Sequence, residues 1–401
     1  MTGESVNSRQ LVGDLSQVLA KHLRFLRGAA GGERANVSHA DLSSHLLVGL
    51  NLEALIAAGA NFSRSDLSKS SLRFADLFCA NLEYANCTRT DLSRADLRGA
   101  RLKGAKLVGA NLREADLRPG NLVVGSAEKP ETDLSNAVLD HADLREANMV
   151  RASMSKSSMV SANLSGAMMS NVDLSQCDLR NANLSRVRLS GANLTGANMR
   201  GATLVGADLS GARINDADFS GADLKNATIG ASPDTADVKP ARIVELHERW
   251  IQTGGAEGAR ADLTGRDLSE QDVNLAGRDM SGAVMIRAIL RRVALRGVKL
   301  QMALLGGANL FEADLTDADL SGADLSYAIM QGACLRRANC GPLQILDAAG
   351  QRTGRLAVTN LTGADLRKAD LSYANFGRAI TTGTLFAGAM LKDSVLPSQN
   401  A

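Results

Sequence analysis

The chain has 401 residues, and its 45 Lys and Arg residues against 43 Asp and Glu residues give a net charge of +2 at pH 7. This balance argues against a protein that binds polyanions and against a strongly acidic mimic of DNA. Apolar residues make up 45% of the chain but aromatic residues only 3%, so the core cannot depend on bulky rings as most globular cores do.

The polar N-terminus MTGESVNSRQ precedes a segment with helical periodicity. It lacks the apolar core of a signal peptide, and no apolar run reaches the roughly 18–20 residues of a membrane span. We therefore expect a soluble, cytoplasmic protein, with export as an effector left open. Residues 8–27 place apolar side chains on one helical stripe, with Ser8 as a candidate N-cap and Gly28 as a stop. We expect this helix to cover the open end of the coils that follow.

A five-residue period begins at Val37 and covers most of the chain, as in ADLRGARLKGAKLVGANLREADLRP. An aliphatic centre recurs at every fifth position up to 122, slips by two across 123–132, and continues from 134 to 229. It resumes at 263 and ends at 340, then returns from 361 to about 391. A period of five fits neither a helix nor a flat strand. The chain must turn a corner every five residues, with the centre and the small residue two before it pointing inward. Such coils stack about 4.8 Å apart.

The unit A-(D/N)-L-x-x, as in ADLSGADLSYA at 318–328, resembles the repeats of the pentapeptide repeat family. The resemblance covers about three quarters of the chain. It implies an all-β solenoid, a right-handed, quadrilateral parallel β-helix with four units per coil. It implies no single function, because members of the family do many different things.

Four units per coil place residues twenty apart on one face. We expect Leu102 to lie between Leu82 and Leu122. Outward Asp residues would form an acidic ladder, which is unfavourable unless neighbouring cations screen it. The ladder would hold Asp76, Asp96 and Asp116, with Arg98 over Arg118, and Arg94 and Arg113 as examples of screening cations.

The segment NLEALIAAGANF (51–62) keeps the five-residue period but also has the pattern of a short helix ending at Gly59. His45, Leu50 and Leu55 are too large for the small inward position. The sequence therefore leaves open whether 51–59 is helical or a widened coil.

Residues 247–263, HERWIQTGGAEGARADL, repeat the pattern of residues 22–37, HLRFLRGAAGGERANV. Both have His-x-Arg-aromatic-aliphatic, a glycine-rich turn, and Arg-Ala before the first unit. The preceding residues VKPARI carry Pro240 near the start of a second helix. We predict two capping helices with apolar aromatic plugs, and arginines that bond carbonyls at the coil edge. The corresponding cap residues are His22 and His247, Phe25 and Trp250, and Arg34 and Arg260.

The repeated pattern predicts two tandem solenoid modules. Their boundaries are 1–35 for the first helix and glycine turn, 36–230 for the first β-helix with its loop at 123–132, 231–262 for a linker and the second helix, and 263–396 for the second β-helix with a hairpin-like insertion at 341–356. Loops on rigid scaffolds often carry function. The hairpin is therefore the best candidate for a specific contact, and the 123–132 loop is second.

No motif indicates catalysis, a cofactor or a metal. The cysteines contain no CxxC pair, which favours free thiols: 79, 87, 177, 334 and 340. The methionines between 149 and 169 fall at centre positions, except Met168, and we interpret them as core filler. The glycine-rich segments GAAGGER and GGAEGAR follow helices and do not match a phosphate-binding loop.

The densest basic run, IRAILRRVALRGVKL at 286–300, is a possible interaction patch. Its cations at outward positions are Arg287, Arg291, Arg292, Arg296 and Lys299. They could meet an acidic protein, a phospholipid or a nucleic acid, although aromatic residues for base stacking are absent. A solvated surface is the simpler interpretation.

These features favour a non-enzymatic scaffold that presents rigid faces and loops to protein partners whose identity the sequence does not give. One alternative is DNA mimicry toward gyrase or topoisomerase, as in the quinolone-resistance members of the family. The balanced charge and the tail KDSVLPSQNA, which shows no dimerisation helix, depart from that pattern. Another alternative is an effector or membrane-associated adaptor that uses the 286–300 run. Nucleic acid is not expected as a partner, and a homodimer is left open.

Overall fold

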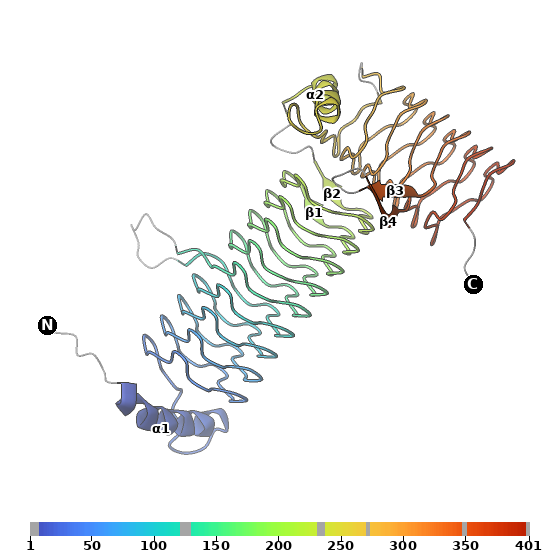
Figure 1. Ribbon diagram of the computed structural model, residues 1–401. Helices are drawn as coiled ribbons and strands as arrows, with labels where there is room; N and C mark the ends of the chain where they lie inside the picture. The colour runs from blue at the N-terminus through green and yellow to red at the C-terminus, as the bar shows by residue number, and fades with distance from the viewer. Residues whose placement is uncertain (1–7, 121–129, 231–236, 270–272, 347–350, 398–401) are drawn as a thin grey trace. The chain divides into compact units, whose positions relative to one another are not determined.

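The computed structural model describes residues 8–120, 130–230, 237–269, 273–346 and 351–397 (Figure 1). The chain divides into two compact units, Met1–Met199 and Arg200–Ala401. Most of each unit is a stack of short coils. The regular elements are α1 (Ser8–Leu26), β1 (Asp208–Leu209), β2 (Thr228–Ile229), α2 (Pro240–Gln252), β3 (Leu343–Leu346) and β4 (Arg352–Ala357).

Neighbouring coils are joined by isolated parallel β-bridges between residues twenty apart, such as Asn61 with Asn81 and Asn81 with Arg101. Such bridges recur at every fifth residue, so each coil has four sides. A side contributes one bridging residue before the chain turns, which is why few named strands form. The period of five read from the sequence is therefore the period of the bridges.

The five-residue unit 80–84 shows how the backbone N–H groups find hydrogen-bond partners. One N–H group closes the turn and three bond to the two adjacent coils: Ala80 to Leu77, Asn81 to Ala60, Leu82 to Arg101 and Tyr84 to Lys103. The fifth N–H, that of Glu83, donates to the side-chain Oδ1 of Asn81 at 3.0 Å. Buried backbone donors need partners, so an Asp or Asn before the central Leu is part of the scaffold. The same side-chain bond recurs in most units with Asp or Asn at this position.

Each unit ends in a β-turn whose third residue has a positive φ. Non-glycine residues at this position lean over the next coil, where a glycine often leaves room. At Gly104 an added Cβ would lie 2.6 Å from the ring of Tyr84 in the coil before. Side-chain size at these corners is therefore coupled between neighbouring coils.

The core consists of the central residues and of small residues two positions earlier. Leu82, Leu102 and Ala100 are fully buried, as the sequence pattern predicts. The methionines at central positions are also fully buried: Met149, Met154, Met159 and Met169. Their burial confirms the interpretation as core filler.

The first insertion changes the stacking order expected around Leu102. Its N–H bonds to the Asp133 carbonyl, and Arg101 pairs with Asp133, thirty-two residues away instead of twenty. The chain leaves the stack after Pro119 and returns at Pro130, where the Gly120 N–H reaches the Pro130 carbonyl at 2.8 Å. Leu102 therefore lies under the coil that begins near Asp133. The expectation that position 122 would cover it was wrong, and Leu122 itself is outside the described residues.

Residues 51–59 form an ordinary coil without a helix. Asn51 pairs with Ser71 and Ile56 with Asp76 in the regular ladder. Leu55 is buried at the small inward position, whereas His45 and Leu50 are half-buried. The coil accommodates the larger residues without leaving the period.

The expected Asp ladder is present, but different arginines screen it. Asp76 pairs with Asp96, which pairs with Asp116. Within the same unit, the Arg98 guanidinium binds Asp96 through Nε at 2.8 Å and Nη2 at 2.6 Å. Arg118 binds Asp116 in the same way. The predicted screening residues instead turn to another acid: Arg94 and Arg113 both contact Glu114.

In the second unit, coils follow α2 with a seven-residue step between the buried centres Leu268 and Leu275. The insertion after Cys340 is an antiparallel hairpin of β3 and β4, with Leu343 opposite Ala357 and Leu346 opposite Arg352. The hairpin expected there from the sequence is thus present. Asn360 resumes the ladder against Asp324, thirty-six residues away.

One side of the coils at 263–396 is covered at positions that point outward. Val284, Ile286 and Ser326 are only 6%, 1% and 1% exposed. Residues 221–224 of the same unit lie against this side: Leu224 Cδ1 is 3.6 Å from the place of a Cβ on Gly306, and the Gly221 N–H donates to Asp324 at 2.8 Å. The apolar outward residues are therefore an internal packing face.

Neither helix in the described residues is long and apolar enough to cross a membrane.

Candidate functional site

A cap histidine precedes each of the two runs of coils, 36–230 and 263–396, and the two histidines, His22 and His247, have the same contacts. His22 and His247 are each 0% exposed. The Ala35 N–H donates to Nδ1 of His22 at 3.1 Å, and the Ala261 N–H donates to Nδ1 of His247 at 3.1 Å. In later units the equivalent N–H bonds to the preceding turn, as Ala40 does to Val37. The imidazole thus supplies an acceptor to the first five-residue unit of each run, which has no preceding turn to supply one.

Burial lowers the pKa of both imidazoles, because a charged ring would lose its hydration. The nearby Arg34 and Arg260 charges act in the same direction on His22 and His247 respectively. The backbone of Glu53 raises the pKa of His22, and the charge of Asp279 raises that of His247, but burial outweighs both. An Nδ1 that accepts a hydrogen bond carries no proton, so both rings are neutral when this bond forms.

Both helices end in the same way. The N–H of Gly28 bonds to Phe25 and that of Ala29 to Arg24, with Gly28 at φ 63°. These bonds form a Schellman motif, so Gly28 is the helix stop that the sequence predicts. At the end of α2, Gly254 and Gly255 bond to Ile251 and Trp250 in the same pattern.

A later glycine of each turn lies directly on its helix. A Cβ on Gly258 would be 2.2 Å from the Leu246 carbonyl oxygen, and one on Gly32 would be 2.3 Å from the Phe25 nitrogen. Such distances are impossible for a real side chain. These two positions therefore require glycine, because the turn is pressed against the helix backbone.

The cap arginines bond to the coil edge, as expected. Nε of Arg34 donates to the Ala54 carbonyl, and Nε of Arg260 donates to the Gly282 carbonyl. Each arginine thus reaches a carbonyl in a turn of the first coil of its run.

The aromatic cap residues are not buried plugs. Phe25 is 41% exposed, and Trp250 is half-buried. Each ring stacks on its histidine, with centroids 6.1 Å apart for Phe25 and 5.5 Å apart for Trp250. The buried residue of the motif is the histidine, and the aromatic ring covers it from the solvent side.

The five cations of the 286–300 run take separate partners. Arg292 binds Glu312 at 2.7 Å, Arg296 lies 3.8 Å from Asp314, and Lys299 lies 3.6 Å from Asp279. Arg291 lies over the ring of Phe311, and Arg287 donates to the Leu224 carbonyl. Five-residue spacing distributes these positions around the four sides of a coil. The run therefore does not gather into one cationic patch.

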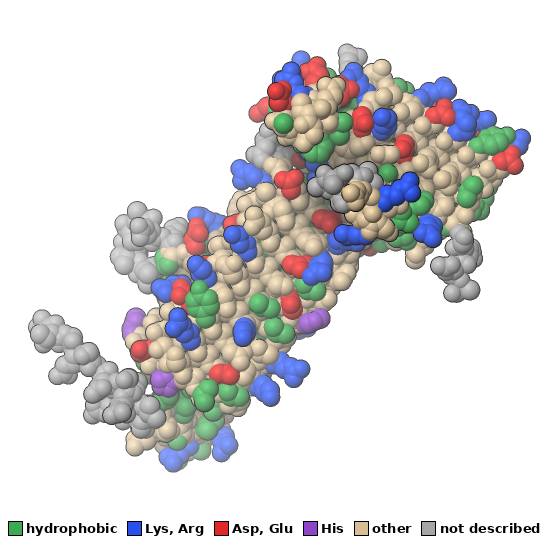
Figure 2. Space-filling view, in the orientation of Figure 1, with side chains coloured by type: hydrophobic (Ala, Val, Ile, Leu, Met, Phe, Trp, Pro, Cys, Tyr) green, Lys and Arg blue, Asp and Glu red, His purple; other side chains and the backbone are tan. Residues whose placement is uncertain are grey.

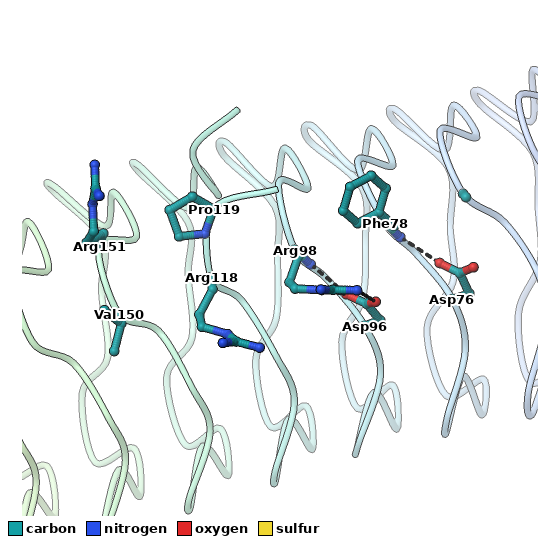
Figure 3. A pocket seen from close by; sticks show the side chains of 9 residues that line it. Asp76, Phe78, Asp96, Arg98, Arg118, Pro119, Val150 and Arg151 are labelled. Atoms are coloured by element: carbon teal, nitrogen blue, oxygen red, sulfur yellow. Dashed lines mark hydrogen bonds and ion pairs between the residues drawn. The ribbon is translucent and has the colours of Figure 1, made fainter. Parts of the chain in front are cut away.

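A groove of about 540 Å³ lies in the first unit, beside the first insertion (Figure 3). It follows one face across successive coils. Its lining residues, in order along the face, are Ala58, Asp76, Phe78, Asp96, Arg98, Arg118, Pro119, Val150 and Arg151. Sequence reasoning missed this groove, because residues 118 and 150 become neighbours only through the insertion.

The centre of the groove is fixed by paired charges. Figure 3 shows Arg98 lying against Asp96, and its Cζ is 5.4 Å from the ring centroid of Phe78. Hydrogen bonding and charge from Asp96 raise the pKa of Arg98. Burial alone would raise the pKa of Asp116, but hydrogen bonds and charge from Arg118 outweigh it and lower that pKa.

The two ends of the groove carry opposite charges that form no ion pair among the described residues. Among the described residues, the Asp76 carboxylate has no ion-pair partner and accepts only the Phe78 N–H, at 3.1 Å. Arg151 at the other end is exposed, and among the described residues its guanidinium has no hydrogen bond or ion pair, whereas its backbone N–H bonds to the Ser170 carbonyl. The groove therefore offers one free anion and one free cation on opposite sides of a fixed centre.

The described residues hold no group of three or more His, Cys, Asp or Glu that could bind a metal. All five cysteines are free thiols. Burial raises the pKa of Cys87 to about 12 and that of Cys177 to about 11, so these thiols are poor nucleophiles. Figure 2 shows acidic and basic side chains interspersed over the visible surface, with no large region of one sign.

The sequence matches the family described as Pentapeptide repeats over residues 46–78, 80–118, 132–171, 157–196, 169–204, 192–229, 271–307, 303–339 and 359–396. These segments cover more than half of the chain. The chain belongs to the pentapeptide repeat family. Pentapeptide repeat proteins fold as right-handed quadrilateral β-helices and are in general non-enzymatic structural or interaction proteins.

Several solved pentapeptide repeat proteins are similar to this chain. HetL from the cyanobacterium Nostoc sp. strain PCC 7120, involved in heterocyst differentiation regulation, is 26% identical, with 72% of this chain and 87% of that chain covered and a TM-score of 0.24. QnrB1, a plasmid-mediated fluoroquinolone resistance protein, is 20% identical, with 49% of this chain and 89% of that chain covered and a TM-score of 0.22. Rfr23 from the cyanobacterium Cyanothece 51142 is 27% identical, with 32% of this chain and 91% of that chain covered and a TM-score of 0.20. TM-scores this low carry no functional argument. No curated protein matches the chain.

Proposed function

We propose that this pentapeptide repeat protein is a non-enzymatic scaffold, and that a partner protein binds along the groove from Asp76 to Arg151. The observation that carries the proposal is that the charges at the two ends of the groove form no ion pair among the described residues, whereas the charges at its centre do. Asp76 accepts the Phe78 N–H of its own unit, as Asn81 accepts that of Glu83, but unlike Asp96 and Asp116 it is not held by an arginine two residues later. The carboxylate of Asp76 and the guanidinium of Arg151 therefore remain available to a partner.

The chemistry of the groove defines the partner segment. A polypeptide lying along the face would place a basic side chain near Asp76 and an acidic side chain near Arg151. Pairs at the edge of an interface mainly set orientation and association rate. Phe78 and Val150, both half-buried, supply apolar contact between the two charges.

A photo-crosslinking amino acid at Val150, inside the groove, tests the proposal. The control carries the same group at Lys69, which is exposed two units from the groove-lining Ala58 and Asp76 and therefore on another side of the coil. We expect the variant with the group at Val150 to give a crosslinked product. Excess protein without the crosslinking group should compete the product away, and the double substitution Arg151→Glu with Asp76→Arg should abolish it. Equal labelling from Val150 and Lys69, or labelling that survives the charge reversal, would contradict groove binding.

The β3–β4 hairpin is the second contact we propose for the scaffold. Residues 352–356 of β4 are exposed. Deleting 343–355 removes the projecting strands while the ladder can still resume at Asn360. If the hairpin contributes, the deletion weakens capture of the partner identified through Val150. Unchanged capture restricts binding to the groove.

We also infer two tandem modules with boundaries near 230 and 263, each opened by a capping helix. The equivalent bonds of His22 and His247, and the equivalent helix ends, support this division. DNA mimicry toward gyrase receives no such support, because the Asp ladder carries arginine forks and the net charge is +2. An effector or membrane-associated adaptor that binds through residues 286–300 is likewise not favoured, since the cations of that segment have separate partners.

A further inference from the structure

A cleft of about 410 Å³ lies in the second unit. One wall comes from the segment 224–226 and the other from the coils at 263–396. The side chains that matter for its chemistry are Leu224, Lys225, Arg287, Tyr327, Ile329 and Asp365. A volume of this size is typical of sites for small molecules.

Arg287 is costly for the fold because its charge is partly buried without a counter-charge. Its guanidinium is half-buried, and within the described residues it has no carboxylate partner; its Nη1 donates only to the Leu224 carbonyl at 3.1 Å. Burial accordingly lowers the pKa of Arg287. A half-buried cation without a counter-charge at the wall of a cleft is explained by an anion that it binds.

The corner glycines position the side chains of this wall. A Cβ on Gly307 would lie 3.3 Å from Cγ of Arg287, and one on Gly363 would lie 2.6 Å from the ring of Tyr327. Both large side chains therefore lie across a glycine of the next coil, along the cleft. Ile329, 43% exposed, adds an apolar surface beside them.

The positive charge of the cleft is not neutralised from within. Asp365 is the acid among the lining residues, and Arg367 binds its carboxylate through Nε at 2.9 Å and Nη2 at 2.7 Å. Burial raises the pKa of Tyr327, and the charge and acceptor oxygens of Asp223 act in the same direction. Lys225 is exposed and has no ion pair among the described residues. Lys225 and Arg287 thus present two uncompensated cations from opposite walls.

We propose that this cleft binds a small organic oxyanion, with its carboxylate or phosphate group between Lys225 and Arg287 and its apolar body against Tyr327 and Ile329. The inference is independent of the scaffold proposal, because the groove and the cleft share no residue.

Isothermal titration of the full chain with phenyl phosphate and with benzoate tests the site, and benzyl alcohol is the uncharged control. We expect saturable binding of at least one anion and none of the alcohol. The anion that binds more tightly distinguishes phosphate from carboxylate, and inorganic phosphate alone shows whether the ring contributes. Hydrogen bonds to charged groups of this kind correspond to about 10- to 100-fold in affinity, so Arg287→Gln should weaken binding by that factor.

Two further variants separate ligand binding from packing. Lys225→Gln changes an exposed side chain and should weaken binding several-fold without altering thermal stability. Arg291→Gln changes a neighbouring cation that lies over Phe311 outside the cleft, and should leave binding unchanged. The proposal is overturned if neither anion binds at about 10 mM, or if binding survives both Lys225→Gln and Arg287→Gln.

Discussion

Nδ1 of His247 accepts a hydrogen bond from the backbone N–H of Ala261 at 3.1 Å. Ala261 begins the first coil of its run, where no preceding turn supplies a carbonyl. The bond therefore connects the helix to the coil stack at an N–H for which the repeat itself supplies no acceptor. The same bond between His22 and Ala35 makes it a common solution for both runs.

Replacing His247 by Ala should destabilise the second run by about 2–4 kcal/mol. The change removes an acceptor from a buried N–H and leaves a cavity under Trp250. Denaturant unfolding with spectroscopic probes measures the loss. His22→Ala should act in the same way on the first run, whereas His141→Ala, at an exposed turn position, should change stability by less than about 0.5 kcal/mol. Equal effects at all three positions would contradict the role of the bond.

Acidification should weaken both caps. The folded-state pKa of His22 and His247 is lowered, so the unfolded chain binds more protons as pH falls below its ordinary value of 6.5. The stabilisation is fully present above pH 6.5 and is lost as pH falls toward the folded-state pKa. Unfolding free energies at pH 7.5 and pH 5.5 test this. The double variant His22→Ala/His247→Ala should lose most of the dependence between these values, and an unchanged slope would show that other groups cause it.

Trp250→Ala should cost about 1–2 kcal/mol, less than His247→Ala. The ring is half-buried and stacks on the imidazole, so its removal loses part of an aromatic contact without opening the core. Trp250→Phe should restore most of the loss. If Trp250→Ala destabilised more than His247→Ala, the tryptophan would be the plug that the sequence pattern predicts.

Gly258→Ala should cost about 3 kcal/mol or more, because the new Cβ would meet the Leu246 carbonyl oxygen at 2.2 Å and force the turn off α2. Gly254→Ala is the matched control in the same turn. It has a similar positive φ but nothing within 4 Å of the added Cβ, so it should cost only about 1–2 kcal/mol. Thermal melts of both variants give the difference, and equal costs would show that φ alone decides.

Asp324→Ala should destabilise the second unit by about 3 kcal/mol. The carboxylate accepts bonds from the N–H groups of Gly221 and Ser326 and from the Asn360 amide, all buried or half-buried. Asn309→Ala, which removes one turn bond to Phe311, is the control and should cost about 1 kcal/mol. Similar losses from the two variants would show that the contact with residue 221 contributes nothing.

The pH dependence at Asp324 has the opposite sign to that of the histidines. Burial raises its folded-state pKa, so the folded state binds more protons than the unfolded chain above the ordinary value of 3.8. Relative to an unperturbed carboxyl, Asp324 therefore favours unfolding as pH rises from 3.8 through the folded-state pKa. The Asp324→Ala variant should be closest to wild type at neutral pH and should diverge from it as pH is lowered.

The sequence predicted the coils, both helices, the glycine stop and the hairpin, because each depends on local periodicity or a local turn. It also identified the paired histidines and arginines, since the motif occurs twice. It failed at Leu102 and in the groove, where a twelve-residue excursion changes which coils are neighbours. The internal packing face was also missed, although Val284 and Leu304 stand where Asp or Asn is usual. Apolar residues at this outward position were the signal in the sequence that could have indicated a covered face. The exposure of Phe25 and Trp250 depends on how the glycine turn folds back, which no periodicity describes.

The backbone arrangement of unit 80–84 has a consequence for how such a protein can change. The ladder joins each coil to the coil before it and the coil after it, and an excursion of twelve or sixteen residues at a corner leaves the ladder intact on both sides. Adding a whole coil would lengthen the spacing between two docking points by one increment of about 4.8 Å. Adding residues at a corner would alter what is displayed there and leave every spacing within the stack unchanged. The spacing along the stack and the segments displayed at its corners can therefore change independently of each other.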